Sequence, residues 1–238
     1  MCGIIGYTGF QSVTPILLEG LARLEYRGYD STGIALINST GGLDVFKSKG
    51  KLKTLTDSIS GTILEGSIGI GHTRWATHGS PNQQNAHPHL DCNKDIVVAH
   101  NGIVENFLEL KQTLEQEGHV FSSETDSECI PHLIEFYIAE GMNFEEAVRF
   151  VSRRLNGSNA VIAFSKKDPS KIVGFKKGYA GGLVVGYGVK EMFISSDLAA
   201  LLPHTRKVVY LSENEFTIIT PGEARYFSYE GDVLLKEV

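Results

Sequence analysis

The sequence contains no apolar stretch long enough to span a membrane, and its first fifteen residues lack a basic segment followed by an apolar one. A membrane-spanning helix needs about 20 consecutive apolar residues, and a secretory signal needs both of those segments. These absences argue against an integral membrane protein and against export. We therefore expect a cytoplasmic protein without a membrane partner.

Runs of like charge and cysteine residues are also lacking or few. The 22 lysines and arginines stand against 28 aspartates and glutamates, for a net charge of −6, and no long run of like charges occurs. This balance argues against a nucleic acid partner and favours a small-molecule substrate. The three cysteines are an odd number without regular spacing, which argues against a disulfide framework and indicates reduced thiols.

No repeat, low-complexity segment or flexible linker divides the 238 residues, and 42% of them are hydrophobic, which suffices for the core of one large domain. Helical spacing of apolar residues predicts helices, at residues 15–27, 105–118, 127–140 and 144–155. Short apolar runs predict strands, at residues 3–7, 33–37, 43–46, 67–71, 96–100, 160–165, 171–175, 182–188, 191–195, 207–211, 216–220 and 224–229. Turns are expected at 167–169 and 221–222. This pattern predicts an α+β domain in which antiparallel sheets pack face to face with helices outside.

The second residue of the chain is a cysteine. If Met1 is removed, Cys2 carries a thiol with a reference pKa of about 8.5 and an α-amine with a reference pKa of about 7.7 to 8.0. Such an amine can take the thiol proton near neutral pH, directly or through a water, and so replaces the histidine base of other nucleophilic enzymes. For a single cysteine near the N-terminus, the alternative is a packed thiol at the start of a strand.

Residues 72–81, HTRWATHGSP, are polar and end in glycine and proline, which is typical of a mobile loop that contacts a ligand. Within this loop Arg74 suits a substrate carboxylate, because its planar group donates two parallel hydrogen bonds. Asp126 suits an ammonium group. The alternatives are a surface ion pair for Arg74 and a helix N-cap for Asp126. An amino acid substrate would require both charges together.

Asn101 and Gly102 follow an apolar run, where a strand ends and a turn starts. A side-chain amide beside an unhindered backbone N–H can form an oxyanion hole for acyl transfer. The alternative is an ordinary Asn-Gly turn.

The segment HPHLDC offers side chains that bind metals, namely His87, His89 and Cys92. No second ligand cluster follows at the usual spacing, so we expect no metal. The glycine-dense residues 178–188 do not fit the G-x-G-x-x-G pattern followed by a helix, so we expect no nucleotide site.

Six segments, in this order, resemble the glutaminase domain of class II glutamine amidotransferases. They are CGIIG at 2–6, LEYRGYDSTG at 24–33, GHTRWATHG at 71–79, NAHPH at 85–89, HNGIVEN at 100–106 and SETD at 123–126. The resemblance covers essentially the whole chain. Within the class, the second and third segments and residues 198–215 are similar to the glutamine–fructose-6-phosphate aminotransferases.

The resemblance implies the fold of N-terminal nucleophile hydrolases, a four-layer α/β/β/α sandwich with two antiparallel sheets. It also implies that Cys2 attacks the side-chain amide of L-glutamine, that its amine carries the proton to the leaving ammonia, and that water hydrolyses the glutamyl thioester. Asn101 and Gly102 would hold the oxyanion. No cofactor is implied. The implied substrate-binding residues are Arg74, Trp75, Thr77, His78 and Asp126, and the supporting residues are Arg27, His87 and His100.

In this family a sugar-phosphate isomerase part follows the glutaminase domain and receives the ammonia. We expect residues 1–238 to be one glutaminase domain without sugar isomerase domains, either excised or serving a separate synthase subunit. Two alternatives are an amidotransferase that feeds a different acceptor and a non-catalytic scaffold. A homodimer is left open. Residues 178–188 depart from the residues usual in the family at that place.

Overall fold

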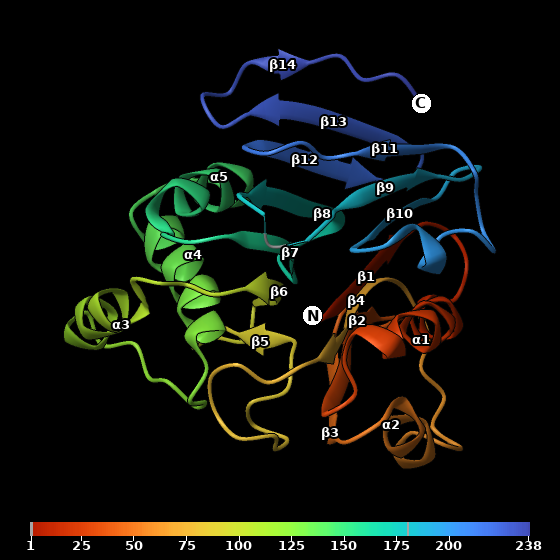
Figure 1. The fold of residues 1–238 in the computed structure, drawn as a ribbon, viewed down its shortest axis with the longest axis horizontal. Coiled ribbons are helices and arrows are strands. Elements are labelled where there is room, and N and C mark those ends of the chain that lie inside the picture. Colours follow the sequence, from red (N-terminus) through yellow and green to blue (C-terminus); the bar gives the residue numbers. More distant parts are fainter. Residues whose placement is uncertain (1, 180) are drawn as a thin grey trace.

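The computed structural model describes residues 2–179 and 181–238. Two seven-stranded antiparallel sheets form its centre (Figure 1). The first sheet has the order β11-β9-β10-β1-β4-β2-β3, and the second has the order β14-β13-β12-β8-β7-β6-β5. The strands of the first sheet are β1 (Gly3–Thr8), β2 (Ser31–Asn38), β3 (Leu43–Lys49), β4 (Gly66–Arg74), β9 (Val184–Tyr187), β10 (Met192–Ser195) and β11 (Val208–Tyr210). Those of the second are β5 (His89–Leu90), β6 (Ile96–Gly102), β7 (Asn159–Ser165), β8 (Asp168–Lys177), β12 (Glu215–Thr220), β13 (Glu223–Ser228) and β14 (Val233–Leu234).

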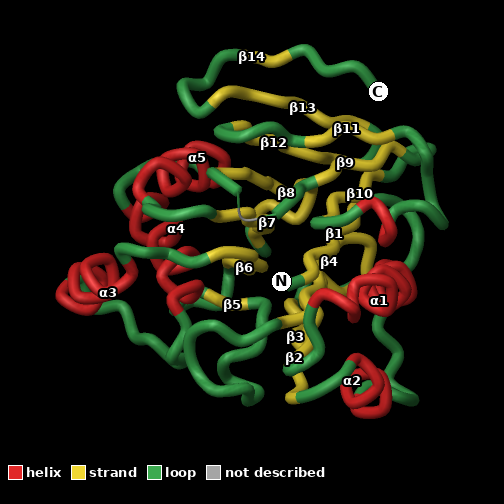
Figure 2. The backbone as a smooth tube through the Cα atoms, in the orientation of Figure 1, coloured by secondary structure: helices red, strands yellow, loops and turns green. Residues whose placement is uncertain are grey.

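Helices cover the outer face of each sheet (Figure 2). The α-helices are α1 (Val13–Leu24), α2 (Leu52–Ser58), α3 (Phe107–Gln116), α4 (Cys129–Ala139) and α5 (Phe144–Arg154). Three short 3₁₀ helices accompany them, η1 (Glu25–Arg27), η2 (Asp126–Glu128) and η3 (Leu198–Ala200). Helices α1 and α2 lie against the first sheet, and α4 and α5 against the second. None of the helices in the described ranges has the length and apolar character needed to cross a membrane.

The alternation of side chains along the strands explains the layers. Ile4 of β1 and Ile162 of β7 belong to the core between the two sheets. Their neighbour Ile5 faces the core under α1, and Val161 faces the core under α4 and α5. Because successive residues of a strand point to opposite faces, strands that are apolar on both faces must be covered on both sides. The expected α+β sandwich of four layers is confirmed.

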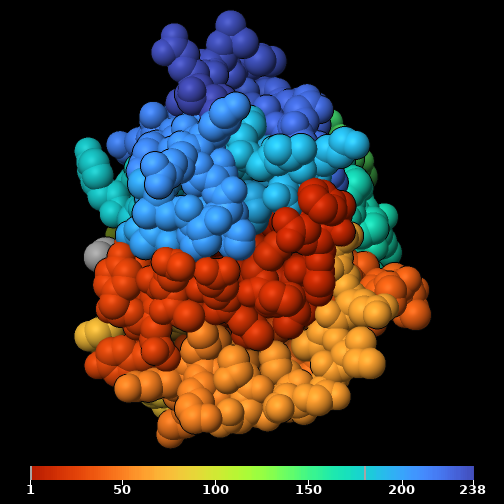
Figure 3. Space-filling view, turned by 90° about the vertical axis from the view of Figure 1, so that its right-hand side faces the viewer, coloured from red at the N-terminus to blue at the C-terminus, as the bar shows by residue number. Residues whose placement is uncertain are grey.

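Segments far apart in the sequence complete the layer around α1. Figure 3 shows the surface of the first residues meeting that of the segment near residue 200. Leu201 is buried in the same core as Leu17 and Leu21 of α1, and the backbone N–H of Ser196 donates to the carbonyl oxygen of Ile4. The start of β1 is therefore held both by packing against α1 and by the hydrogen bond from Ser196.

The structure differs from the sequence-based expectations at several places. Helix α2 and the short strands β5 and β14 were not expected. The turn expected at 167–169 is wrong, because β8 already begins at Asp168 and the turn occupies residues 166–167. His72 and Arg74, expected in a mobile loop, lie in β4 and are buried. The other predicted helices and strands are present with shifted ends.

Candidate active site

Cys2 lies directly before β1, beside the end of β4. Antiparallel pairing places Gly3 opposite Thr73, so Cys2 reaches the residue that follows Arg74. The backbone N–H of Trp75 donates to Cys2 Sγ at 3.2 Å, and the thiol lies 3.6 Å from the Trp75 carbonyl oxygen. Burial raises the pKa of the Cys2 thiol, while the Trp75 N–H opposes that rise. The thiol therefore needs a base in order to react near neutral pH. Met1 lies outside the described residues.

Asn101 and Gly102 are the last two residues of β6 rather than a turn. The side-chain amide of Asn101 donates to the carbonyl oxygen of Cys2 at 3.2 Å. Gly102 has a φ of +140°, and a Cβ there would lie 2.1 Å from the Ser158 carbonyl oxygen, so only glycine fits. The ordinary Asn-Gly turn is excluded, and the pair of candidate oxyanion donors lies beside Cys2.

His72 determines which way the Asn101 amide faces. Burial lowers the pKa of His72 to about 3, so its ring is neutral. Its Nε2 lies 3.0 Å from the His100 carbonyl oxygen and 3.1 Å from Asn101 Oδ1. Both are acceptors, so Nε2 carries the hydrogen. The amide NH₂ of Asn101 is thereby turned toward Cys2. The sequence analysis assigned no role to His72, although it stands two residues before Arg74, on the same face of the strand.

Arg27 binds the backbone carbonyl group of Cys2. Its Nε donates to the Cys2 carbonyl oxygen at 2.9 Å, and its Nη1 lies 3.0 Å from Asp197 Oδ2. The hydroxyl of Tyr26 donates to the same Asp197 oxygen at 2.8 Å. Asp197 was not foreseen from the sequence, because it comes from the segment before η3 at the other end of the chain.

Arg74 is buried at the end of β4, which excludes a surface ion pair. Its Nη2 donates to the carbonyl oxygens of His78 and, at 3.2 Å, of Gly79. Its Nη1 is buried and has no hydrogen-bond partner among the described residues. Buried donors in native proteins are nearly always paired, so this guanidinium nitrogen is available for an acceptor that a ligand would bring.

Asp126 lies close to the same loop. Its Oδ2 accepts the backbone N–H of Val104 at 2.7 Å, and its Oδ1 lies 4.0 Å from His78 Nδ1. It opens η2, whereas Glu128 is the N-cap of α4, so Asp126 does not cap that helix. Arg74 and Asp126 thus present opposite charges on the two sides of His78.

A cavity of about 500 Å³ opens beside Cys2. It is lined by Cys2, Arg27, Trp75, Thr77, Asn101, Gly102, Ile103, Glu105, Ser158 and Tyr179. Six of the residues singled out from the sequence therefore share one cavity. Arg74, His78 and Asp126 lie outside that lining, in the contacts described above. The last four lining residues were not singled out as site residues from the sequence, although Ile103 and Glu105 belong to the segment HNGIVEN.

The supporting histidines lie behind the cavity. His100 contacts Asn159 Oδ1 at 2.9 Å and Ser127 Oγ at 2.8 Å. His87 stacks on His72, with ring centroids 4.1 Å apart. Burial lowers the pKa of both residues, so these rings are neutral at physiological pH. They pack and orient groups of the site without adding charge.

Comparison with known proteins gives matches over the whole chain. The glutamine amidotransferase domain family matches residues 72–203. The glutamine–fructose-6-phosphate aminotransferase of Methanothermobacter thermautotrophicus is 47% identical over 239 residues, which cover 100% of this chain and 40% of that protein. The corresponding protein of Aquifex aeolicus is 45% identical over 242 residues, with 100% and 39% covered. The chain spans about two fifths of the length of these relatives.

Solved structures share the fold. Glutamine phosphoribosylpyrophosphate amidotransferase of B. subtilis, complexed with ADP and GMP, has a TM-score of 0.82 at 22% identity, covering 98% of this chain and 50% of that one. A structure described as the allosteric regulatory enzyme of purine biosynthesis has a TM-score of 0.83 at 23% identity, covering 96% of this chain and 49% of that one. The likeness confirms the fold expected for an N-terminal nucleophile hydrolase. From the match over more than half of its residues, the chain belongs to the glutamine amidotransferase domain family.

Proposed function

We propose that the chain hydrolyses L-glutamine to L-glutamate and ammonia through a thioester on Cys2. The observation that carries this proposal is that Cys2 and Asn101 line one cavity, with the Asn101 amide bonded to the Cys2 carbonyl oxygen. Two buried groups of opposite charge, Arg74 and Asp126, both contact His78 of the loop that follows β4. Glutamine supplies the three matching parts, namely a carboxylate, an ammonium group and a hydrolysable amide.

The reaction begins at the amine that removal of Met1 exposes. This amine takes the thiol proton, and the thiolate attacks the side-chain carbonyl carbon of glutamine. The negative oxygen that forms is held by Asn101 Nδ2 and the Gly102 N–H. The intermediate then collapses, the carbon–nitrogen bond breaks, and the amine returns its proton to the leaving ammonia. Water, deprotonated by the same amine, hydrolyses the thioester to glutamate.

The two charged groups position the remote end of the substrate. Arg74 Nη1, buried without a partner among the described residues, donates to the α-carboxylate. Asp126 accepts from the α-ammonium. Trp75, Thr77 and His78 belong to the loop between β4 and β5 that covers the substrate, while Arg27 keeps the Cys2 backbone in place. Binding at a distance from the reacting carbon orients the amide against the thiol.

We infer the acceptor of the ammonia from the names of the relatives. Their name, glutamine–fructose-6-phosphate aminotransferase, supports the transfer of ammonia to fructose 6-phosphate, which yields glucosamine 6-phosphate. A sugar-phosphate isomerase domain or subunit would receive the ammonia. The free state of Cys2, Cys92 and Cys129 in the structure is compatible with work in the cytoplasm.

The test measures glutamate released from L-glutamine by the chain and by Cys2→Ala, with mass spectrometry of each N-terminus. We expect activity only from wild-type chains that lack Met1. A wild-type chain carrying an uncleaved residue before Cys2 is the matched control, because it keeps the thiol and blocks the amine. Equal activity of Cys2→Ala and the wild type would refute the role of Cys2 as the nucleophile.

A second measurement addresses the acceptor. The chain is combined with a separately expressed sugar-phosphate isomerase part of a relative, and glucosamine 6-phosphate formed from fructose 6-phosphate is quantified. Glutamine-dependent product that disappears with Cys2→Ala supports this acceptor. Glutamate release without any amino sugar would favour the alternative, a glutaminase that serves a different acceptor.

A further inference from the structure

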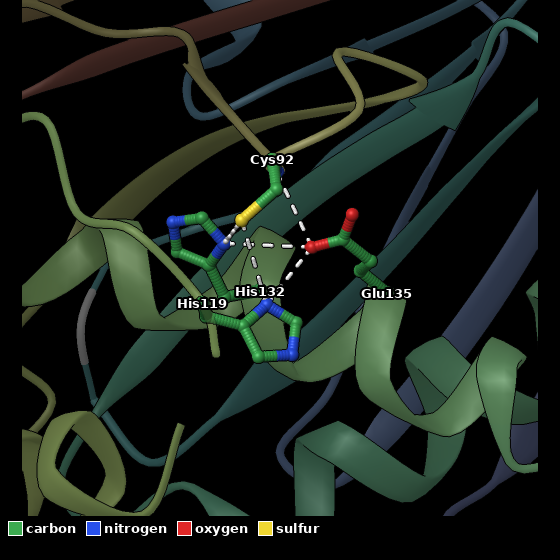
Figure 4. Close-up of side chains that lie close together, drawn as sticks. All are labelled: Cys92, His119, His132 and Glu135. Atoms are coloured by element: carbon green, nitrogen blue, oxygen red, sulfur yellow. Dashed lines mark hydrogen bonds and ion pairs between the residues drawn. The ribbon is translucent and has the colours of Figure 1, made fainter. Parts of the chain in front are cut away.

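Four side chains typical of metal ligands converge on the outer side of the second sheet. Cys92 lies in the turn between β5 and β6, His119 follows α3, and His132 and Glu135 stand three residues apart on α4. Their ligand atoms all lie within 4.8 Å of one another. Figure 4 shows the sulfur, one nitrogen of each ring and one carboxylate oxygen facing a common point.

Three of the four distances from a ring nitrogen to the sulfur or the carboxylate oxygen are close to those around a tetrahedral zinc ion, and the fourth, between His119 and Glu135, is shorter. Cys92 Sγ lies 3.7 Å from His119 Nδ1 and 3.5 Å from His132 Nδ1. Glu135 Oε2 lies 2.9 Å from His119 Nδ1 and 3.6 Å from His132 Nδ1. Zinc bonds of about 2.3 Å to sulfur and about 2.1 Å to nitrogen and oxygen, at tetrahedral angles, place sulfur and nitrogen about 3.6 Å apart, and nitrogen and oxygen about 3.4 Å apart. Small shifts of the side chains would complete this geometry.

The surroundings suit a divalent cation. The side chain of His132 is 1% exposed, that of His119 10% and that of Glu135 13%. One thiolate from Cys92 and one carboxylate from Glu135 would balance the +2 charge of the ion, and the two histidine rings would bind it as neutral ligands. Cys92 is exposed at the surface, which provides an entry path. The donor set of one sulfur, two nitrogens and one oxygen favours zinc over calcium or magnesium.

A second layer of contacts orients the ligands. Glu128 Oε1 lies 3.7 Å from His132 Nε2, the ring nitrogen opposite the one that faces the cluster, and a closer approach would be needed for a hydrogen bond. A carboxylate behind a ligating histidine is the usual outer contact of zinc sites. The backbone N–H of Cys92 donates to Glu135 Oε2 at 3.2 Å. This hydrogen bond thus connects α4 with the β5–β6 turn beside the proposed ion.

We propose that Cys92, His119, His132 and Glu135 bind one zinc ion as a closed structural site that ties α4 to the β5–β6 turn and to the segment after α3. Four protein ligands leave no open position for catalysis. The sequence-based expectation of no metal rested on the spacing around HPHLDC. In the structure His89 turns away from Cys92 and contacts Thr125 Oγ1 at 3.0 Å, while ligands from two other segments take its place.

Binding the ion would release the thiol proton of Cys92, because the thiolate is the ligand. Helix α4 begins just after η2, which carries Asp126. A metal that pins α4 therefore steadies the side of the cavity on which Asp126 lies. Zinc binding at this cluster does not depend on the proposed glutaminase activity, since the four ligands lie outside the cavity lining.

The first test measures zinc by mass spectrometry in protein purified without chelators or metal-affinity columns. All chains carry Cys2→Ala, which removes the other thiol that could take zinc. We expect about one zinc per chain, and none in Cys92→Ser or Glu135→Gln. Glu140→Gln, at the exposed end of the same helix, and Cys129→Ala, a thiol outside the cluster, are the matched controls and should keep the ion. Absence of zinc from the parent chain, before and after zinc is added to metal-free protein, would overturn the proposal.

The second test uses cobalt(II) and heat. Metal-free chain titrated with cobalt should develop a thiolate-to-cobalt charge-transfer band that Cys92→Ser lacks. Zinc should raise the melting temperature of the parent and of Glu140→Gln, because binding to the folded state stabilises it, and should leave Glu135→Gln unchanged. Equal cobalt spectra and equal zinc-induced shifts in parent and variants would place the metal elsewhere and refute the site.

Discussion

Arg74 contacts a part of the substrate that does not react. Replacing it with alanine should therefore raise the KM for glutamine about tenfold to hundredfold, as expected for the loss of charged hydrogen bonds, and change kcat much less. Steady-state glutamate release at varied glutamine checks this. Arg74→Lys keeps the charge but loses the planar pair of donors. Its KM should therefore lie between those of the wild type and Arg74→Ala. An unchanged KM in Arg74→Ala would contradict carboxylate binding.

Asn101 acts at the opposite end of the substrate, where charge develops. Asn101→Ala should lower kcat by about a hundredfold to a thousandfold and leave KM nearly unchanged, because the donor matters most in the transition state. Single-turnover measurement of glutamate formation isolates that step. Asn101→Asp is the matched variant, since it keeps the shape and removes the donor, and it should be equally slow. A rise in KM without a change in kcat would refute the oxyanion role.

His72 is a positioning residue, since it touches Asn101 and not the cavity. His72→Ala should lower kcat about tenfold, the equivalent of one hydrogen bond. In an Asn101→Ala background the same change should have no further effect on kcat, because the amide that it orients is gone. The kcat values of the wild type, the two single variants and the double variant test whether the two residues act together. Effects that simply multiply would show that His72 acts through packing alone.

The candidate site could be predicted from the sequence in part. Cys2, Asn101, Arg74 and Asp126 carry chemistry that marks them, and the simpler explanations of the last three fail for physical reasons. Arg74 is buried, Asn101 lies in a strand, and Asp126 caps no helix. Asp197 could not be found this way, since it joins Arg27 across 170 positions. The role of His72 depends on the direction of its hydrogen bond to Asn101. The spacing of residues in the sequence does not reveal that direction.

At the scale of single elements, the start of α5 offers a stability test. Asn143 accepts the backbone N–H of Glu146, and the Glu146 side chain accepts the N–H of Asn143, which together form a capping box. Asn143→Ala should cost about 1 kcal/mol of unfolding free energy, measured by urea denaturation, because it leaves a helix donor unpaired. Asn143→Asp keeps the acceptor and should cost much less. Equal losses in both variants would contradict the capping role.

The elements also show where sequence reasoning succeeds. Helices α1 and α5 have an apolar face at helical spacing, and β1 and β7 are apolar on both faces, so their type and burial could be predicted. Helix α2 was missed because its seven residues hold only Leu52 and Leu55 as buried anchors. The turn before β8 was misplaced because Pro169 normally marks a turn, yet here it stands near the start of a strand.

The two sheets of the molecule are joined by more than apolar packing. His72 belongs to β4 in the first sheet, and its Nε2 contacts the His100 carbonyl oxygen of β6 in the second. His87 stacks on His72, and His87 and His89 are in edge contact at 4.4 Å. Burial lowers the pKa of all four rings. The junction of the sheets is therefore built from histidines that must remain neutral.

This junction predicts that the protein loses stability in mild acid. The unfolded chain binds protons at these histidines near pH 6.5, but the folded chain does not until far lower pH, so stability is present above pH 6.5 and falls as the pH decreases. Each histidine contributes a slope of up to about 1.4 kcal/mol per pH unit. Carboxylates with ordinary pKa values add little above pH 5, whereas burial raises the pKa of Asp91 to about 6, so proton uptake by folded Asp91 offsets part of the histidine slope.

Urea denaturation at pH 7.5, 6.5 and 5.5, at constant ionic strength, measures the slope. His89→Gln keeps a polar partner for Thr125 and removes one titrating ring from the cluster. Its stability should fall less steeply between pH 6.5 and 5.5, by about the slope of one histidine. Any loss of unfolding free energy that His89→Gln causes at pH 7.5 does not affect the test, because only the change of unfolding free energy with pH is compared. Parallel pH curves for the two proteins would show that His89 takes up its proton equally in both states.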